Sequence, residues 1–364
     1  MACFAMGVFL LSLLHTAGGV GATPLRFSVS GQSAGGSMAV NHLFAYSSHV
    51  DGATIAAGSP YGCGVQPDEE DRCYYGHVDI KASIAWVYWR HEQGLIDDPA
   101  NLKNIPVLLF NGKWDECVYT RVMQDTYKQL RFFMNESMIF QRFSTHAAHV
   151  WSLDNGQCSC GTCSDFVGSL ECCDVNNCNY DLSGDSLRAF YGEIKPRKVA
   201  HPTLVHVDQW KYLPPEATFN ATIGELPRGG LWKFALVYVP ESCKERVDSC
   251  RIHVNYHGCI KKRLDRRRLW ATSINLNEYA EANDIIVVYP QAAGSHGEGI
   301  GCWNWGDEKA DHYFDTRRAV QLRTIMNLLE DLPNAIQNAK NVEELGNVEE
   351  DSEDANVSVA SLVV

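Results

Sequence analysis

The chain has 364 residues, of which 45% are hydrophobic and 21% are charged. This balance is typical of a globular protein and excludes collagen-like, coiled-coil and largely disordered classes. Lys and Arg total 31 against 44 Asp and Glu, and the resulting net charge of -13 argues against a nucleic-acid partner.

The first 22 residues have the pattern of a secretory signal peptide. An uncharged apolar run at 4–14 is followed by small residues that end in Val20-Gly21-Ala22. The run is too short to cross a bilayer, and no later segment is typical of a membrane anchor. No Lys or Arg precedes the run, so a buried N-terminal helix is the alternative interpretation. Residues 1–22 are predicted to be removed from an exported protein.

Beyond residue 22, short β-rich runs alternate with helical patterns. A strand is predicted at 25–30 and a helix at 38–46, so residues 31–36 form a strand-to-helix turn. Alternation of this kind predicts a mostly parallel sheet covered by helices, in one catalytic domain over 23–335. The further predicted elements are strands at 53–57, 106–110, 138–143, 232–239, 251–256 and 285–289, and helices at 119–133 and 276–283.

The C-terminal residues 336–364 are predicted to be an acidic, disordered tail. Within them, 341–354 carries seven acids and no base. A segment so charged has too little hydrophobicity to order itself, and it accounts for much of the net charge of the chain.

Fourteen cysteines are typical of an exported, disulfide-bonded protein. Without Cys3 of the signal peptide thirteen remain, so at least one thiol is free or paired between chains. Cys63 with Cys73 and Cys243 with Cys250 are candidate local disulfides. Three N-x-Ser/Thr sequons fit a glycosylated secreted product, and they lie at Asn135, Asn220 and Asn356.

Six cysteines crowd one stretch of the second quarter of the chain: Cys158, Cys160, Cys163, Cys172, Cys173 and Cys178. Their C-x-C and C-x-x-C spacings could ligate zinc. In an oxidising compartment such a cluster more often closes small disulfide loops, which is the interpretation favoured here. The sequence therefore predicts no metal and no other cofactor.

The predicted turn carries a candidate nucleophile. Gly31-Gln32-Ser33-Ala34-Gly35 matches G-x-S-x-G, in which glycines relieve crowding in a tight turn that lifts the serine hydroxyl above the sheet. A Gly-rich turn without catalytic meaning is the alternative. The strand before the pentapeptide and the helix after it favour Ser33 as the nucleophile.

A serine hydroxyl needs an imidazole base and a carboxylate that orients the imidazole. In hydrolases of this type the acid follows a later strand and the histidine follows the acid. Asp115 comes soon after the strand at 106–110 and is the candidate acid, with a solvated turn aspartate as the alternative. His146 and His149 both follow the strand at 138–143, and their spacing alone cannot choose between them.

Several short motifs occur in a characteristic order along the chain. They are Ser28 to Gly36, Ala45-Tyr46-Ser47, Ala57 to Cys63, Ile96-Asp97-Asp98, Asn111-Gly112, Ala147-Ala148-His149, Cys178 to Asp181, His257-Gly258-Cys259, Val288 to Ala292 and Gly301 to Trp305. Together they resemble the extracellular poly(3-hydroxybutyrate) depolymerase and related esterase family. The resemblance extends over about residues 27–330, and it implies that Ser33 is the nucleophile, Asp115 the acid and His149 the base.

The order of these motifs predicts a circularly permuted α/β-hydrolase. The strand that ends in His257-Gly258-Cys259 looks like the oxyanion-loop strand, and the strand at 285–289 looks like the next one. Both follow the triad, whereas in most α/β-hydrolases they precede it. The oxyanion hole is then expected to use the backbone N–H groups of Ala34 and Cys259.

The resemblance also implies a Cys259–Cys302 disulfide. That bond would bring Trp303 and Trp305 to the oxyanion loop, where exposed aromatic rings could hold an aliphatic polyester chain. The alternative is a pair of tryptophans packed in the core. Gly306-Asp307-Glu308 stands where the family has a further aromatic residue, so ester cleavage is the firmer expectation and polymer binding the weaker one.

The sequence as a whole predicts a secreted serine esterase, and the resemblance implies polyesters of hydroxyalkanoates or their oligomers as substrates. A general carboxylesterase acting on small or plant-derived esters is the nearest alternative. A catalytically inactive, disulfide-rich binding protein on a hydrolase scaffold is the alternative from another class. The oligomeric state is left open.

Overall fold

A computed structural model describes residues 25–341, with gaps at 66–69, 157, 161–173, 216, 218–227, 262–263, 295–299 and 307–310. The expected signal peptide lies outside the described residues, as do most of the expected acidic tail and the sequons at Asn220 and Asn356. Asn135 is described, and it is exposed.

A nine-stranded sheet forms the centre of the molecule, in the order β13-β7-β8-β11-β9-β1-β2-β3-β4. Neighbouring strands from β11 to β4 run parallel, whereas the pairings of β8 with β11, β7 with β8 and β13 with β7 are antiparallel. The strands are β1 Phe27–Gln32, β2 Val50–Ala56, β3 Val107–Phe110, β4 Ile139–Arg142, β7 Val205–Asp208, β8 Phe234–Tyr238, β9 Arg251–Tyr256, β11 Ile285–Tyr289 and β13 Lys340–Asn341.

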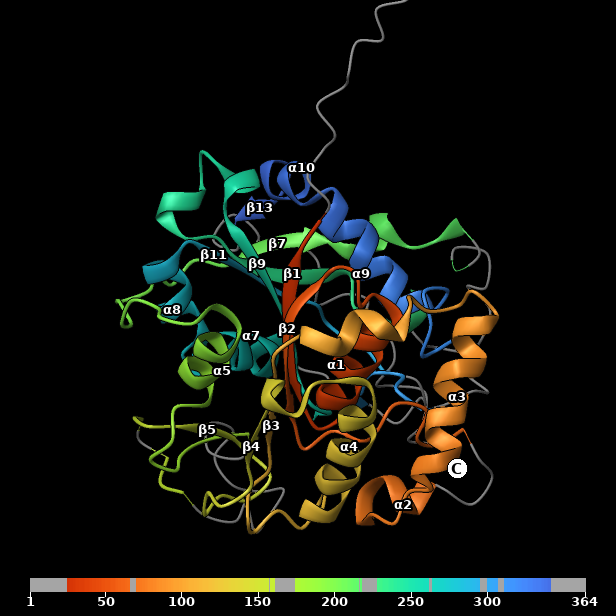
Figure 1. Cartoon of the computed structure of the whole chain (residues 1–364). Helices are drawn as coiled ribbons and strands as arrows, with labels where there is room; N and C mark the ends of the chain where they lie inside the picture. Colours follow the sequence, from red (N-terminus) through yellow and green to blue (C-terminus); the bar gives the residue numbers. More distant parts are fainter. Residues whose placement is uncertain are drawn as a thin grey trace, which may run out of the picture.

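Helices cover both faces of the sheet. Helices α1, α4 and α9 lie on one side, and α5, α7 and α8 on the other (Figure 1). The described helices are α1 Ala34–Ala45, α2 Glu70–Tyr75, α3 Ile80–Glu92, α4 Thr120–Phe133, α5 Leu182–Tyr191, α7 Leu264–Ser273, α8 Leu276–Asn283, α9 Val320–Glu330 and α10 Leu332–Gln337. Two small sheets complete the described elements: β5 Trp151–Leu153 with β6 Val175–Asn177, and β10 Ile260–Lys261 with β12 Ile300–Gly301.

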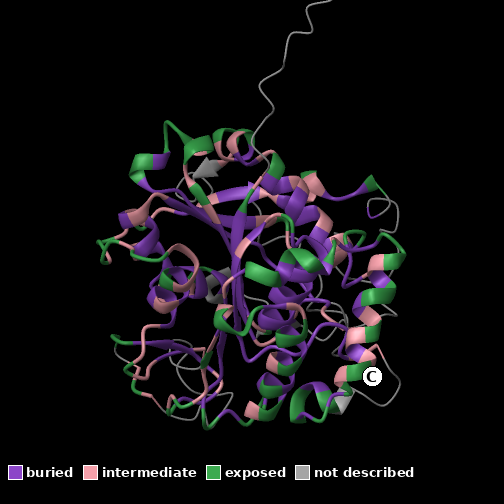
Figure 2. Ribbon diagram, in the orientation of Figure 1, coloured by how far each residue is buried: buried purple, intermediate pink, exposed green. Residues whose placement is uncertain are grey.

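The core consists of two apolar layers, one on each face of the sheet. The central strands are buried along their length, and exposed residues gather on the outer faces of the helices (Figure 2). Strands β1 and β11 are buried at every position, as expected for parallel strands with helices on both faces. No helix among the described residues is long and apolar enough to cross a membrane.

The strand order confirms the permuted α/β-hydrolase fold. Strand β9 pairs with β1 in parallel, and β11 pairs with the far side of β9, although both come late in the chain. The hydrogen bond between Ser28 and His253 joins residues 225 positions apart. The strand that precedes Ser33 therefore lies beside the strand that leads into His257-Gly258-Cys259.

The expected cysteine pairs are present. Disulfides join Cys63 to Cys73, Cys243 to Cys250, and Cys259 to Cys302. In the crowded stretch Cys160 pairs with Cys178, and Cys158 is disulfide-bonded as well. Cys163, Cys172 and Cys173 lie outside the described residues. The described part of the crowded stretch thus holds disulfides, as favoured over zinc.

Candidate active site

Four parallel strands end together and place the candidate residues at one edge of the sheet. Gln32, Ala56, Phe110 and Arg142 stand side by side at the carboxyl ends of β1, β2, β3 and β4. The segments that follow β1, β3 and β4 carry Ser33, Asp115 and His149. Ligands of open α/β sheets bind outside the carboxyl ends of the strands, so this edge is the candidate site.

Ser33 occupies a strained turn between β1 and α1. Its backbone angles are φ 58° and ψ -127°, and its N–H donates to the Ala56 carbonyl at 2.9 Å. A Cβ atom at Gly31 would lie 2.1 Å from the Gly35 carbonyl oxygen, so the first glycine of the motif admits the turn that follows it. Positive φ in a non-glycine residue is costly and clusters at functional sites. The conformation is that of a nucleophile elbow.

The loop after β9 packs directly against Ser33. A Cβ atom added to Gly258 would lie 3.3 Å from Ser33 Cβ, so only a residue without a side chain fits there without displacement. Cys259 follows in the loop, and the Ala34 N–H belongs to the first turn of α1, where backbone donors have no partner within the helix. The two expected oxyanion donors therefore belong to segments that meet at Ser33.

His257 holds this loop from inside the protein. Its Nε2 accepts the N–H of Ala292 at 3.2 Å, so its Nδ1 carries the proton and donates to the Gly258 carbonyl at 2.5 Å. Burial lowers the pKa of His257 to about 4, which keeps the ring neutral in this arrangement. No pattern in the sequence predicted this positioning role, although His257 belongs to the His257-Gly258-Cys259 motif.

Asp115 is a buried carboxylate whose two oxygens are both occupied. Its side chain is 1% exposed. Oδ1 accepts the backbone N–H groups of Cys117 at 2.9 Å and Val118 at 2.8 Å. Oδ2 accepts the Asn111 amide at 3.0 Å and lies 2.8 Å from His149 Nδ1. Donors on both oxygens fix the orientation of the carboxylate, which accepts a hydrogen bond from His149 Nδ1.

Two backbone hydrogen bonds join the acid loop to the histidine loop. The N–H of Lys113 donates to the Thr145 carbonyl at 2.8 Å, and that of Trp114 donates to the Ala147 carbonyl at 2.9 Å. His149 is 22% exposed and reaches Asp115 from this framework. His146 points elsewhere: it is exposed and its ring lies 5.1 Å from the Trp114 ring. The geometry therefore favours His149 over His146 as the partner of Asp115.

The relation of Ser33 to His149 differs from that of His149 to Asp115. Among the described residues, the Ser33 hydroxyl has no hydrogen bond to His149. The Asp115–His149 pair is thus formed, and Ser33 stands apart from it at the same edge of the sheet. In proteins without substrate, hydrogen bonds of this kind are often long and shorten only when substrate binds.

The expected role of Trp303 in substrate binding is wrong. Trp303 is 1% exposed, its Nε1 donates to the His257 carbonyl at 2.9 Å, and its ring packs edge-on against Tyr256 at 4.9 Å. The indole closes the core beneath the loop after β9 because that face is apolar and offers one acceptor for its N–H. Trp305 is half-buried and packs edge-on against the exposed ring of Tyr74 at 5.9 Å, so its contact with substrate stays a prediction.

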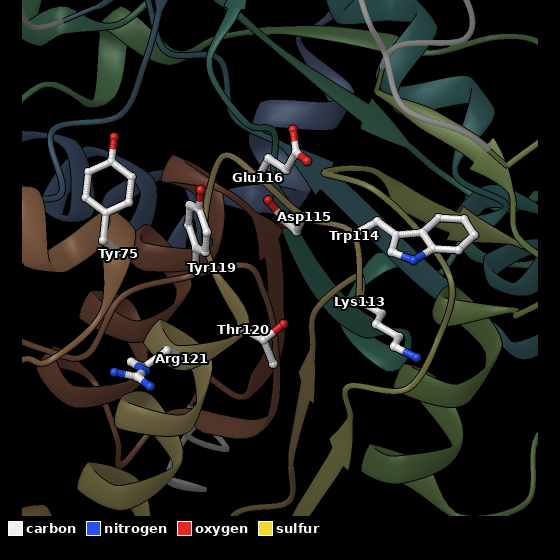
Figure 3. A pocket seen from close by; sticks show the side chains of 8 residues that line it. All are labelled: Tyr75, Lys113, Trp114, Asp115, Glu116, Tyr119, Thr120 and Arg121. Atoms are coloured by element: carbon white, nitrogen blue, oxygen red, sulfur yellow. The ribbon is translucent and has the colours of Figure 1, made fainter.

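Other aromatic residues border the site instead. A cavity of about 630 Å³ is lined by Tyr75, Lys113, Trp114, Asp115, Glu116, Tyr119, Thr120 and Arg121. Tyr75 and Tyr119 lie on one side of Asp115 and Trp114 on the other (Figure 3). The Tyr75, Trp114 and Tyr119 side chains are 56%, 48% and 44% exposed, and the two tyrosine rings are 5.4 Å apart. No motif in the sequence predicted these residues: Trp114 and Tyr119 lie in the segment between β3 and α4, whereas Tyr75 ends α2.

A free thiol also lies close to the acid and the base. Among the described cysteines, Cys117 is exposed and unpaired. Its sulfur and one ligand atom each of Asp115 and His149 all lie within 4.8 Å of one another. Partial burial, together with the charges of Asp115 and Glu116, raises the pKa of Cys117. The thiol is therefore protonated at neutral pH.

Comparisons with known proteins show which proteins this chain is similar to. No family model matches the sequence. The chain is 29% identical over 293 residues to a poly(3-hydroxybutyrate) depolymerase of Delftia acidovorans, covering 79% of this chain and 55% of the relative. It is 28% identical over 295 residues to a polyhydroxybutyrate depolymerase of Talaromyces funiculosus, covering 78% of this chain and 82% of the relative. The chain thus spans about half the length of the Delftia protein.

Two solved structures are similar over most of the chain. One is a PHB depolymerase complexed with an R3HB trimer, with a TM-score of 0.71, and the other is the PHB depolymerase of Penicillium funiculosum, with a TM-score of 0.72. Both are 26% identical to this chain, and each match covers 87% of this chain and 98% of the other. The resemblance of the sequence to poly(3-hydroxybutyrate) depolymerases is therefore confirmed, together with the α/β-hydrolase fold.

Proposed function

We propose that this protein is a secreted serine esterase that hydrolyses polyester or oligoester bonds of the poly(3-hydroxybutyrate) type. The observation that carries the proposal is the hydrogen bond between Asp115 and His149, formed at the sheet edge where Ser33 occupies a strained elbow. The depolymerase relatives, one of them complexed with an R3HB trimer, support the substrate class. Several disulfides among the described residues support export.

In the proposed reaction, Ser33 Oγ attacks the ester carbonyl carbon while His149 Nε2 takes the hydroxyl proton. Asp115 stays ionised and stabilises the imidazolium through Nδ1. The negative oxygen of the tetrahedral intermediate accepts hydrogen bonds from the Ala34 and Cys259 N–H groups. His149 returns its proton to the leaving alcohol, and a water molecule, deprotonated by His149, then releases the acid from Ser33.

Three exposed aromatic residues, Tyr75, Trp114 and Tyr119, form an apolar surface beside Asp115 on which the substrate chain can lie. Tyr75 and Tyr119 border the cavity beside Asp115, and the methyl and methylene groups of a hydroxyalkanoate chain can be buried against their rings. Trp114 is exposed on the opposite side of Asp115. Rings of this kind tolerate chains of varying length because the contacts are not directional.

The test is hydrolysis by wild type and Ser33→Ala of three substrates: a soluble short-chain ester, an R3HB trimer and a polyhydroxybutyrate suspension. We expect wild type to cleave all three and the variant to lose at least about a thousandfold in rate, as when a triad member is removed. Equal rates for the two proteins would overturn the assignment of Ser33.

The same panel separates the alternatives. Cleavage of the soluble ester without cleavage of the trimer or polymer would indicate a general carboxylesterase. A fluorophosphonate probe that fails to label folded wild type at Ser33 would indicate an inactive binding protein on a hydrolase scaffold.

A further inference from the structure

The strongest unexplained feature is the thiol of Cys117 beside the acid and the base. Three different metal-ligating side chains meet there: a buried carboxylate, a partly exposed imidazole and an exposed thiol. Together they form a mixed O, N and S donor set, which suits zinc and other thiophilic divalent cations. A hard cation such as Mg²⁺ prefers oxygen ligands alone.

The spacing of the donors is close to that of a tetrahedral site. Ligand atoms around one zinc ion are about 3.5 Å apart, given bond lengths of about 2.0–2.3 Å. The donor atoms of Asp115, Cys117 and His149 are at most 4.8 Å apart, and His149 Nδ1 and Asp115 Oδ2 are already 2.8 Å apart. A rotation of the Cys117 side chain therefore brings the thiol into range.

The two loops hold the donors ready and leave a path from solvent. Two backbone N–H groups fix Asp115, and backbone hydrogen bonds from Lys113 and Trp114 fix the histidine loop to the acid loop. Cys117 is exposed, so a cation can bind the sulfur first and then the less exposed donors of His149 and Asp115. Three protein ligands leave a fourth position for water.

We propose that Asp115, Cys117 and His149 form an inhibitory binding site for a thiophilic divalent cation such as Zn²⁺ or Cd²⁺. This inference rests on the proposed function, because the inhibition it describes is that of the esterase. The cation bonds to the Cys117 sulfur, one ring nitrogen of His149 and one Asp115 oxygen, and the thiol proton leaves to solvent. No electron transfer is involved.

Binding through Nδ1, the ring nitrogen that faces Asp115, explains the inhibition. The cation takes the place of the proton between Nδ1 and Asp115, so the carboxylate no longer orients the imidazole. The ring proton is then on Nε2, which has no lone pair left to take the Ser33 proton. The base is lost while the aromatic residues around the site stay in place.

The experiment titrates Cd²⁺ into wild type, Cys117→Ser and Ser33→Ala, and follows ester hydrolysis and cadmium–thiolate charge-transfer absorption in the ultraviolet. For wild type we expect inhibition and absorption over the same concentration range. Loss of one ligand in Cys117→Ser should weaken inhibition at least about tenfold, each activity being taken relative to the metal-free variant, and should remove the absorption. Mg²⁺ should have no effect at the same concentrations.

Ser33→Ala keeps all three ligands and separates the two proposals. We expect it to show the wild-type absorption although it lacks hydrolysis. If metal-free wild type hydrolyses no ester, the proposed function fails, while the absorption still decides the metal site. If wild type and Cys117→Ser respond alike in absorption or in inhibition, the cation binds elsewhere and the inference is overturned.

Discussion

Asp115 is buried, and both oxygens of its carboxylate accept hydrogen bonds. A substitution that removes its charge therefore also changes the hydrogen bond that orients His149. One oxygen accepts hydrogen bonds from two backbone N–H groups, and the other accepts hydrogen bonds from Asn111 and His149. An asparagine at this position presents an N–H to His149 Nδ1 and thereby favours the wrong tautomer of the imidazole. We expect Asp115→Asn to lower kcat for a soluble ester by about 10⁴ without unfolding the protein.

Glu116→Gln provides the matched control for this prediction. It removes the same charge from the next residue along the chain, which lines the cavity but has no hydrogen bond to His149 among the described residues. We expect less than about a tenfold change in kcat, since an exposed charge in water interacts weakly. Similar losses in both variants would mean that net charge, and not orientation of His149, sets the rate.

His257 acts on the proposed reaction through the loop it holds. His257→Leu removes the hydrogen bonds to the Gly258 carbonyl and the Ala292 N–H, so the Cys259 N–H is no longer fixed. We expect kcat to fall by about 10²–10³, the cost of losing one oxyanion donor, with little change in KM. His257→Gln can restore a donor and an acceptor and should recover part of the loss. A rise in KM at unchanged kcat would instead indicate a role in substrate binding.

The G-x-S-x-G motif was enough to identify Ser33 as the candidate nucleophile. The order of residues along the chain reduced the candidates for the base to His146 and His149. The choice of His149 needed a family resemblance, because only the backbone pairing of two loops directs its ring toward Asp115. The sequence could not decide between an exposed and a buried Trp303, and it gave no sign that Cys117 approaches His149. Both depend on how loops from distant parts of the chain settle around the sheet edge.

Helix α1 approaches the end of β9 unusually closely, and glycine makes that approach feasible. A Cβ atom at Gly35 would lie 2.3 Å from the Tyr256 carbonyl oxygen, which is too short for any contact without backbone movement. We expect Gly35→Ala to lower the free energy of unfolding by about 3 kcal/mol, at the upper end of overpacking costs. Urea denaturation would measure the loss.

Gly192→Ala is a useful comparison for that measurement. Nothing lies within 4 Å of a Cβ atom there, and its φ of 73° is the sole source of strain. The expected cost is about 1 kcal/mol. If Gly35→Ala lowers the free energy of unfolding by no more than Gly192→Ala does, the backbone between α1 and β9 can move apart more easily than the geometry indicates.

The sequence predicted some helices and strands at their observed residues and failed to indicate others. Strands β9 and β11 occupy the predicted residues: β11 is a buried run of β-branched residues, and β9 has isoleucine and valine at alternate positions. Helix α3 was not singled out, since its pattern is inverted: Ser83 and Arg90 are buried, whereas Tyr88 and Trp89 are exposed. A buried ion pair with Asp315, 2.9 Å away, accounts for the burial of Arg90, and Asp315 lies more than two hundred residues later in the chain.

Across the whole molecule, buried neutral histidines make stability depend on pH. Burial lowers the pKa of His42 and His253 to about 3 and that of His257 to about 4. In the unfolded chain each titrates near its ordinary value of about 6.5. Between these values the unfolded state binds protons that the native state does not, so stability is full above about pH 6.5 and declines as pH falls toward 4.

We expect unfolding at pH 5 to take up about one proton for each of these histidines, which corresponds to about 1.4 kcal/mol per pH unit for each. Urea denaturation between pH 4 and 8 measures the slope. His253→Gln should reduce the slope by about 1.4 kcal/mol per pH unit, the contribution of one proton. An unaltered slope in His253→Gln would mean that this ring is already charged in the native protein.

The permuted strand order has a consequence for how the molecule is made. Strand β1 is the earliest described strand, yet it lies inside the sheet between β2 and β9, and one of its contacts spans 225 residues. During synthesis its second edge stays without a neighbour until most of the polypeptide has left the ribosome. High contact order of this kind slows folding and leaves an open edge exposed to aggregation. The segment that carries the proposed nucleophile is thus the one for which a nascent chain would most need a chaperone.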